Sequence, residues 1–149
     1  MMNSAVAKRY GQALLQLAQE NNAVDKYQEE LTLAVETIEQ DAELLHVWNG
    51  KEYDNETKIK VVKAIFTGKV SAHIVNLLCV VINKGRENCL ADILAMYKVY
   101  ADEVRNVAYA EVVSAFALSD EQQKALSDAL AHKTGKNIKL TVTVDPSLL

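Results

Sequence analysis

The chain has 149 residues, of which half are hydrophobic and 24% are charged, so it is long enough for one medium-sized domain or two small ones around a real core. Its 16 basic and 20 acidic side chains give a formal net charge of −4 at pH 7, and no stripe of basic residues is present that would bind a phosphate backbone, which argues against nucleic acid as a partner. No apolar run reaches the length of a membrane span and the first residues lack the pattern of a secretory signal, so we expect a cytoplasmic protein.

The first hundred residues are expected to be helical almost throughout, because apolar residues recur at spacings of three and four. Asp41 is placed to cap a short third helix, and Asp54 or Asn55 to cap the fourth. Asn and Gly residues mark the ends of several of these segments, as is common where helices stop. The first four predicted helices cover residues 4–21, 24–38, 41–49 and 55–67.

A fifth helix is expected over residues 71–84, with Ser71 as its cap, and it differs from the others in having almost no polar face. A helix that is apolar all round is either the buried centre of its bundle or is covered on its outer side by a partner, and both can hold at once. Gly85 suits the left-handed conformation past the helix end. A sixth helix is expected over residues 90–104.

After Arg105 the pattern changes, and we expect a domain boundary there, between residues 1–105 and 106–149. Residues 106–116 are rich in Val, Tyr and Ala without helical spacing, which predicts a largely buried strand. A helix follows from the capping box of Ser119 with Gln122, and residues 138–144 alternate as a second strand. Because two strands and one helix are marginal alone, this α/β domain is expected to be incomplete.

Two Thr-Gly-Lys sequences, which start at Thr67 and Thr134, are not phosphate-binding loops. Such a loop needs an earlier glycine, a Ser or Thr after the lysine, and a position between a strand and a helix, so that its backbone N–H groups surround the phosphates. Here Val70 and Asn137 follow the lysines, and both glycines stand where helices end. We therefore expect no nucleotide site and no bound cofactor.

The remaining polar residues do not form a recognisable reaction centre. The three histidines are scattered over different helices, without the spacing of metal ligands, and no strained turn presents a Ser or Cys nucleophile. Cys79 and Cys89 are expected to be reduced thiols. The acidic pairs at residues 29–30 and 102–103 are interpreted as solvated charge. The sequence therefore favours an interaction protein over an enzyme, with no catalytic residue and no metal site.

Four segments in the same order and with similar spacing resemble the delta subunit of bacterial rotary ATP synthases, whose mitochondrial relative is the oligomycin-sensitivity-conferring protein. No single segment is a strict motif, but together they cover nearly the whole chain. The four segments are AVAKRYGQALLQLAQENN, NLLCVVINKGRENCLADI, AEVVSAFALSDEQ and VTVDPSLL.

The resemblance implies a mainly α-helical protein, with an N-terminal six-helix bundle over residues 1–105 and a small α/β domain over 106–149. It also implies a non-catalytic stator subunit of the proton-translocating ATP synthase. In that family the subunit ties the catalytic head to the peripheral stalk, so that the head does not turn with the rotor.

In the family, the N-terminal helix of an alpha subunit docks in a groove between the first and fifth helices. Such an occupant would cover the outer side of the apolar fifth helix, in the mode of an amphipathic helix laid into an apolar groove. The residues assigned to this groove are Tyr10, Ala13, Leu14, Leu17, Leu77, Val80, Val81 and Lys84.

The family uses its C-terminal domain to hold the b subunits of the stalk. There the Asp-Pro-Ser-Leu stretch leads into further strands and a last helix, so we expect a shortened domain in this chain and weakened stalk binding. The implied location is the cytoplasmic face of the bacterial inner membrane, which the subunit meets only through the complex. The alternative is a helical RNA-binding module or another protein–protein adaptor. An RNA-binding module would need a basic face, whereas the lysines here are spread among acids.

Overall fold

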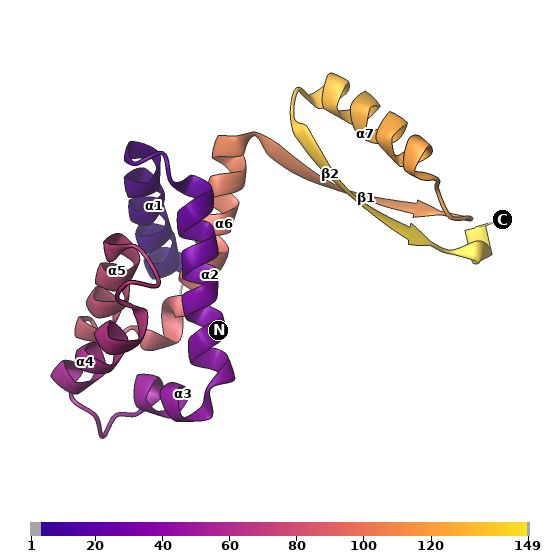
Figure 1. Cartoon of the computed structure of the whole chain (residues 1–149). Helices are drawn as coiled ribbons and strands as arrows, with labels where there is room; N and C mark the ends of the chain where they lie inside the picture. The colour runs from indigo at the N-terminus through magenta and orange to yellow at the C-terminus, as the bar shows by residue number, and fades with distance from the viewer. Residues whose placement is uncertain (1–3, 149) are drawn as a thin grey trace. The chain divides into compact units, whose positions relative to one another are not determined.

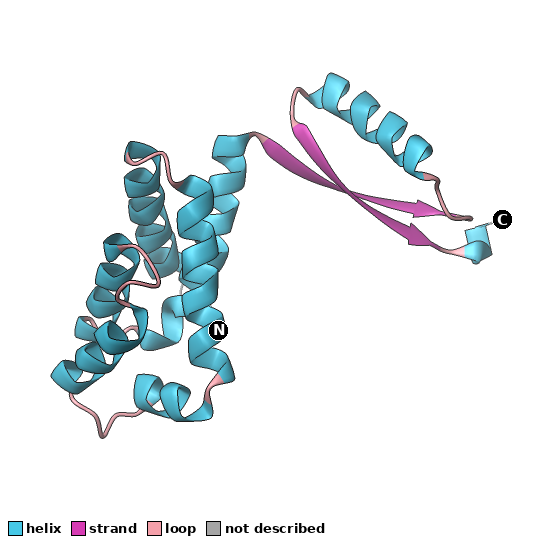
Figure 2. Ribbon diagram, viewed as in Figure 1, coloured by secondary structure: helices cyan, strands magenta, loops and turns pink. Residues whose placement is uncertain are grey.

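The computed structural model describes residues 4–148 and is mainly α-helical, with one small parallel sheet near the end of the chain (Figure 1, Figure 2). The predicted mainly helical class is therefore confirmed. The outermost residues of both predicted domains, 1–3 and 149, lie outside this description. In the described part the α-helices are α1 Ser4–Glu20, α2 Val24–Gln40, α3 Ala42–Asn49, α4 Asn55–Phe66, α5 Ala72–Asn83, α6 Leu90–Arg105 and α7 Asp120–Thr134. The strands are β1 Val107–Ser114 and β2 Asn137–Val144, and short 3-10 turns cover Glu87–Cys89 and Pro146–Leu148.

The chain divides into two compact units between Ala101 and Asp102, inside α6 and before the helix ends. The last turn of α6 is bonded to the strand that follows it. Asp102 accepts a hydrogen bond from the Arg105 guanidinium at 3.0 Å and another from the Tyr109 hydroxyl at 2.9 Å. The bond to Asp102 raises the pKa of Tyr109. These contacts make the end of α6 part of the second unit, and they show that Asp102 is not simply solvated charge.

Helix α1 approaches α6 through Gly11, which lies in the middle of α1. A Cβ atom at Gly11 would lie 3.1 Å from the Tyr97 backbone nitrogen and 3.2 Å from the Met96 Cβ atom. Glycine normally weakens a helix interior by about 1 kcal/mol relative to alanine. Here it allows close packing of the two helices, so a residue that is unfavourable for the isolated helix serves the tertiary structure.

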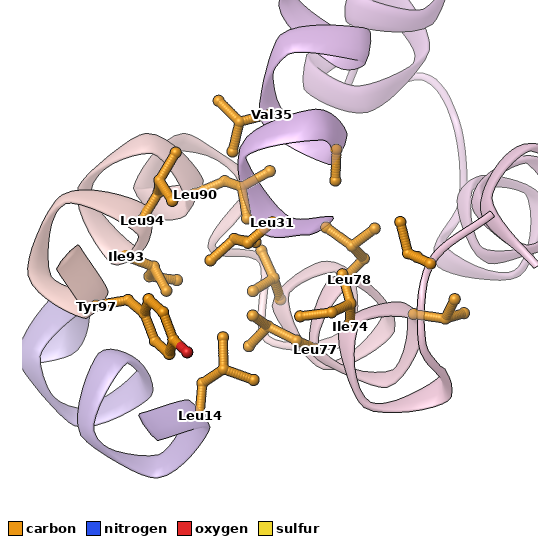
Figure 3. Close-up of a cluster of buried hydrophobic side chains, with 14 of the residues drawn as sticks. Leu14, Leu31, Val35, Ile74, Leu77, Leu78, Leu90, Ile93, Leu94 and Tyr97 are labelled. Atoms are coloured by element: carbon orange, nitrogen blue, oxygen red, sulfur yellow. The ribbon is translucent and has the colours of Figure 1, made fainter. Parts of the chain in front are cut away.

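The hydrophobic core of the first unit is built from α1 to α6, and α5 contributes six of its buried residues; Figure 3 shows part of this core. Burial of each such side chain contributes about 1.5–3 kcal/mol. Tyr97 is fully buried, and its hydroxyl donates a hydrogen bond of 2.6 Å to the carbonyl of Val24, so the one polar atom of this ring has a partner. The largest fully buried side chains are Tyr97, Phe66, Leu31, Ile38, Ile74, Leu78, Ile82, Ile93, Val62 and Val81.

The helix caps follow the sequence signals at most positions. The Asp41 carboxylate accepts hydrogen bonds from the backbone N–H groups of Glu43 and Leu44, and of the two candidates for α4, Asp54 is the cap. Ser119 and Gln122 form the predicted capping box of α7. Ser71 occupies the cap position of α5 but its side chain makes no capping bond, so that part of the prediction is wrong.

In the second unit, β1 and β2 pair in parallel and are joined by α7 (Figure 1). The prediction that residues 106–116 form a largely buried strand is wrong in its burial. Side chains of β1 alternate instead, with Val112 half-buried and Tyr109 and Val113 exposed, and no residue from 102 to 148 is fully buried. The reason is that a single helix covers the small sheet. Such a unit buries little apolar surface.

After β2 the chain forms a short 3-10 turn that starts at Pro146. The Asp145 carboxylate accepts hydrogen bonds from the Ser147 hydroxyl at 2.6 Å and from the Ser147 backbone N–H at 3.1 Å. These bonds hold the pKa of Asp145 below its ordinary value.

Candidate binding groove

An open groove of about 270 Å³ lies between α1 and α5, and its walls are almost entirely apolar. On each helix the lining residues follow a spacing of i, i+3, i+4 and i+7, which places them on one face. The face of α1 and the face of α5 lie opposite each other, and the groove is the space between them. The lining residues are Tyr10, Ala13, Leu14 and Leu17 of α1 and His73, Asn76, Leu77 and Val80 of α5.

The groove has a buried floor and an exposed rim. The floor is formed by Leu14 and Leu77, which are 3% and 9% exposed and also belong to the core cluster. Ala13 and Val80 stand on the rim, where the Val80 side chain is 41% exposed. Val80 therefore has exposed apolar surface, and a docked apolar side chain would be stabilised by burying it.

The structure brings together six of the eight residues assigned to the groove from sequence. Val81 is fully buried and points into the core, so it does not line the groove. Lys84 is exposed at the C-cap of α5, on the same helical face as Val80 but beyond the lined part. The apolar appearance of α5 thus has two causes, a face buried in the core and a second face along the groove.

Sequence reasoning missed two lining residues, His73 and Asn76. His73 lies four positions before Leu77 and Asn76 lies four positions before Val80, so helical spacing from those two residues would have found both. The sequence assignment on α5 began at Leu77 and did not extend to the preceding residues of the helix, where His73 and Asn76 lie. The His73 ring also packs against Tyr27 of α2, with centroids 5.9 Å apart, which fixes one wall of the groove to the core.

Arg86 lies beside the groove, near the start of α1. Its guanidinium carbon lies 5.9 Å from the centroid of the Tyr10 ring, within the range of a cation–π contact. Since Arg86 follows α5, this contact places the beginning of α1 beside the end of α5. The groove therefore runs from Tyr10 and Val80 at one end to Leu17 and His73 at the other.

The start of α5 is held by a carboxylate from another helix. The Glu30 Oε2 atom accepts a hydrogen bond of 2.8 Å from the Ser71 backbone N–H, while its Oε1 atom is buried without a hydrogen-bond partner among the described residues. Burial, and next the charge of Glu30, raise the pKa of the nearby Tyr27. Glu30 therefore binds the backbone of the Ser71 cap residue, and it is not the solvated residue that the sequence indicated.

A buried ion pair lies outside the groove and was also missed from sequence. The Lys58 ammonium is 2.6 Å from the Glu87 carboxylate and donates a hydrogen bond of 2.9 Å to the Trp48 carbonyl. The Trp48 indole N–H in turn donates to the Glu87 carbonyl at 3.2 Å. These bonds join α3, α4 and the turn before α6.

Among the described residues, the cysteines and histidines form no reactive site. Cys79 and Cys89 are free thiols, as predicted, and burial raises the pKa of Cys79 although the charge of Lys63 opposes the shift. His46 contacts Glu52 at 2.9 Å on the surface. Within residues 4–148 no three His, Cys, Asp or Glu side chains are grouped so that they could hold a metal ion. No helix in that range has the length and apolar character needed to cross a membrane.

Comparison with known proteins identifies the family. A family model described as ATP synthase delta (OSCP) subunit matches residues 6–149. The chain is 39% identical over 149 residues to ATP synthase subunit delta of Desulforamulus reducens, across 100% of this chain and 82% of that protein. The subunit of the same name from Desulfitobacterium hafniense is 37% identical, across 100% of this chain and 83% of that protein.

A solved structure shares the fold. A chain in the cryo-EM structure of the Toxoplasma gondii mitochondrial ATP synthase hexamer matches with a TM-score of 0.63 and 23% identity, over 95% of this chain and 79% of that one. The family match over nearly the whole length and the identity to the bacterial relatives decide the assignment. The chain therefore belongs to the ATP synthase delta (OSCP) subunit family.

Proposed function

We propose that this chain ties the catalytic head of the ATP synthase to its peripheral stalk by binding the N-terminal helix of an alpha subunit in the groove between α1 and α5. As a delta-family member it is a peripheral-stalk component of the F-type enzyme and a non-catalytic subunit. The observation that carries the proposal is the open groove, whose surface is mostly apolar and whose lining residues follow the same helical spacing on both walls.

An amphipathic helix fits such a groove because its own apolar stripe repeats every three or four residues. Both walls of the groove, α1 and α5, belong to the first unit, and α1 to α6 share one hydrophobic core. We therefore propose that α1 to α6 are the family's six-helix bundle. A tether that resists the torque of the rotor needs slow dissociation. An affinity on the order of 1 nM, equivalent to roughly 12 kcal/mol, would serve, and burial of the exposed rim would contribute to it.

The second unit is proposed to face the stalk. In this assignment residues 106–149 contact the b subunits, and the family membership of the chain supports it. The subunit would act at the cytoplasmic face of the bacterial inner membrane, and would meet the membrane only through the complex. By holding the catalytic head still while proton flow turns the rotor, the subunit would allow rotation to drive ATP synthesis. No reaction would take place at the subunit itself.

The test is calorimetric titration of the full chain with a synthetic peptide of the cognate alpha N-terminus. Val80→Asp places a charge on the apolar rim, and we expect it to weaken binding by at least about a hundredfold, because the docked helix would bury that carboxylate without a partner. Ala13→Asp, on the opposite wall, is expected to act in the same way.

Each substitution has a matched control on α6. Val99 is 48% exposed, close to the value for Val80, and Ala95 is exposed like Ala13. Val99→Asp and Ala95→Asp should leave the affinity unchanged. If the groove variants are folded by circular dichroism and bind the peptide as tightly as the controls do, the groove is not the docking site.

A further inference from the structure

The two ends of the groove carry opposite charges, although the chain as a whole is acidic. At the end formed by Tyr10 and Val80, the nearby charged side chains on its two walls are basic. Arg86 lies over Tyr10, Lys84 is one helical turn beyond Val80, and Arg9 is one turn before Ala13. Lys84 and Arg9 are exposed, so their charges face solvent and are available to a bound segment.

No carboxylate of the described chain neutralises this basic end. Neither Lys84 nor Arg86 forms an ion pair within residues 4–148. Glu87 is next in sequence, but its carboxylate is bound to Lys58 and is 13% exposed. The sequence of α5 contains no acidic residue. Among the described residues these positive charges therefore have no acidic partner, which is the situation expected where a bound partner supplies the counter-charge.

The opposite end is acidic on α1. Glu20, the one acidic residue of that helix, is exposed and stands three positions after Leu17. Glu30 adds a carboxylate at the start of α5. Lys69 is the nearest basic residue in sequence to that helix start, so the acidic end is less strongly charged than the basic end.

We infer that the groove orients the helix it binds, with acidic side chains of the helix beside Lys84 and Arg86. This inference rests on the proposed function. An isolated helix is stabilised by carboxylates in its first turn and by basic side chains in its last turn. The partner is therefore an amphipathic helix with an acidic beginning, which lies with its N-terminus at Tyr10 and runs in the same direction as α1.

Paramagnetic broadening in NMR spectra tests the orientation. A nitroxide is attached to the first residue of the cognate alpha N-terminal peptide, which is added to the isotope-labelled full chain. The amide signals of Tyr10 and Lys84 should broaden, whereas those of Leu17 and His73 should not. The reverse pattern, or equal broadening at both ends, overturns the inference while it leaves the docking proposal intact. A peptide that does not bind overturns both.

A charge reversal tests the electrostatic cause. Lys84→Glu should weaken binding of the same peptide about threefold to tenfold at low ionic strength, and the difference should vanish at high salt because exposed pairs are screened. Lys124→Glu changes the net charge equally, on exposed surface of α7, and should have no effect. Equal affinities of the two folded variants, or a loss that does not depend on salt, contradict the assignment.

Discussion

At the scale of single residues, the ammonium group of Lys58 is a buried charge, and its bonds join α4 to Trp48 and Glu87. The Lys58 side chain is 5% exposed and that of Glu87 is 13% exposed. Removal of two charges from water costs several kcal/mol for each ion, and their attraction offsets this only when both remain. The pair therefore acts as a unit: loss of one member leaves an uncompensated charge, whereas loss of both removes the cost.

We predict a large coupling energy for this pair. Glu87→Leu alone should lower the free energy of unfolding by about 3 kcal/mol, and the double variant Lys58→Met with Glu87→Leu should recover much of that loss. Urea unfolding followed by fluorescence of Trp48, the one tryptophan in the chain, reports this unit. The exposed pair of Lys60 and Glu56 is the control, with an expected coupling below about 0.5 kcal/mol. Additive effects at the buried pair would show that it is not coupled.

Gly11 gives a second prediction at this scale. Gly11→Ala should gain about 1 kcal/mol in helix propensity, but the added methyl group would press on the backbone of Tyr97, which cannot move without shifting α6. We expect a net loss of about 1 kcal/mol in the same urea assay. Gln12→Ala, at an exposed neighbouring position of α1, should be neutral or slightly stabilising. A Gly11→Ala protein more stable than the wild type would mean that α1 and α6 have room to separate.

At the scale of helices, backbone N–H groups at the N-termini of α4 and α5 are hydrogen-bonded in two different ways. Helix α5 begins against Glu30 from α2, so its beginning depends on the tertiary structure. Helix α4 begins with a local cap, in which the Asp54 carboxylate accepts a hydrogen bond of 2.8 Å from the Thr57 backbone N–H. The bonds to Thr57 lower the pKa of Asp54. Only the local cap could be read from neighbouring residues in the sequence.

The lowered pKa of Asp54 predicts a pH dependence of stability. A carboxyl group with a lower pKa in the folded state stabilises the fold above its unfolded pKa, about 4, and this contribution is lost as the pH falls through the folded value. The urea midpoint of the wild type should therefore drop more steeply between about pH 4 and pH 2 than that of Asp54→Asn. Identical profiles for the two proteins would show that the cap does not contribute through ionisation.

At the scale of the whole molecule, the two units differ in how much surface they bury. All of the fully buried side chains lie in the first unit, as far as Ala101, and none lies in the described part of the second. Local stability follows burial, because segments with few buried apolar contacts open at low free-energy cost. The groove is thus built on the stable unit, as a site that must transmit force requires.

Hydrogen exchange of the free chain should show this difference directly. We expect the amides of β1, α7 and β2 to exchange faster than those of α2, α5 and α6, by at least about a hundredfold at the slowest sites. Measurement by mass spectrometry after proteolysis resolves the segments. Uniform protection across both units would contradict the expectation, and would mean that the second unit is stabilised by more than its own small core.

Much of this architecture could be predicted from sequence, for definite reasons. Helical spacing located α1 to α6, and local caps such as Asp41 and Ser119 fixed several helix starts. Periodicity also found most of the groove. It could not separate Val80 on the rim from Val81 in the core, because adjacent valines on an apolar helix look alike until packing is known. The pairing of Lys58 with Glu87 was hidden for a related reason, since nothing local connects residues so far apart.

Hydrogen exchange of the full chain, measured with and without the alpha N-terminal peptide, locates the bound helix. Binding in the groove predicts slower exchange in α1 and α5, centred on the segments around Leu14 and Leu77, with little change in α3. Protection confined to other helices, or no change at saturating peptide, would contradict the claim that this groove attaches the subunit to the catalytic head.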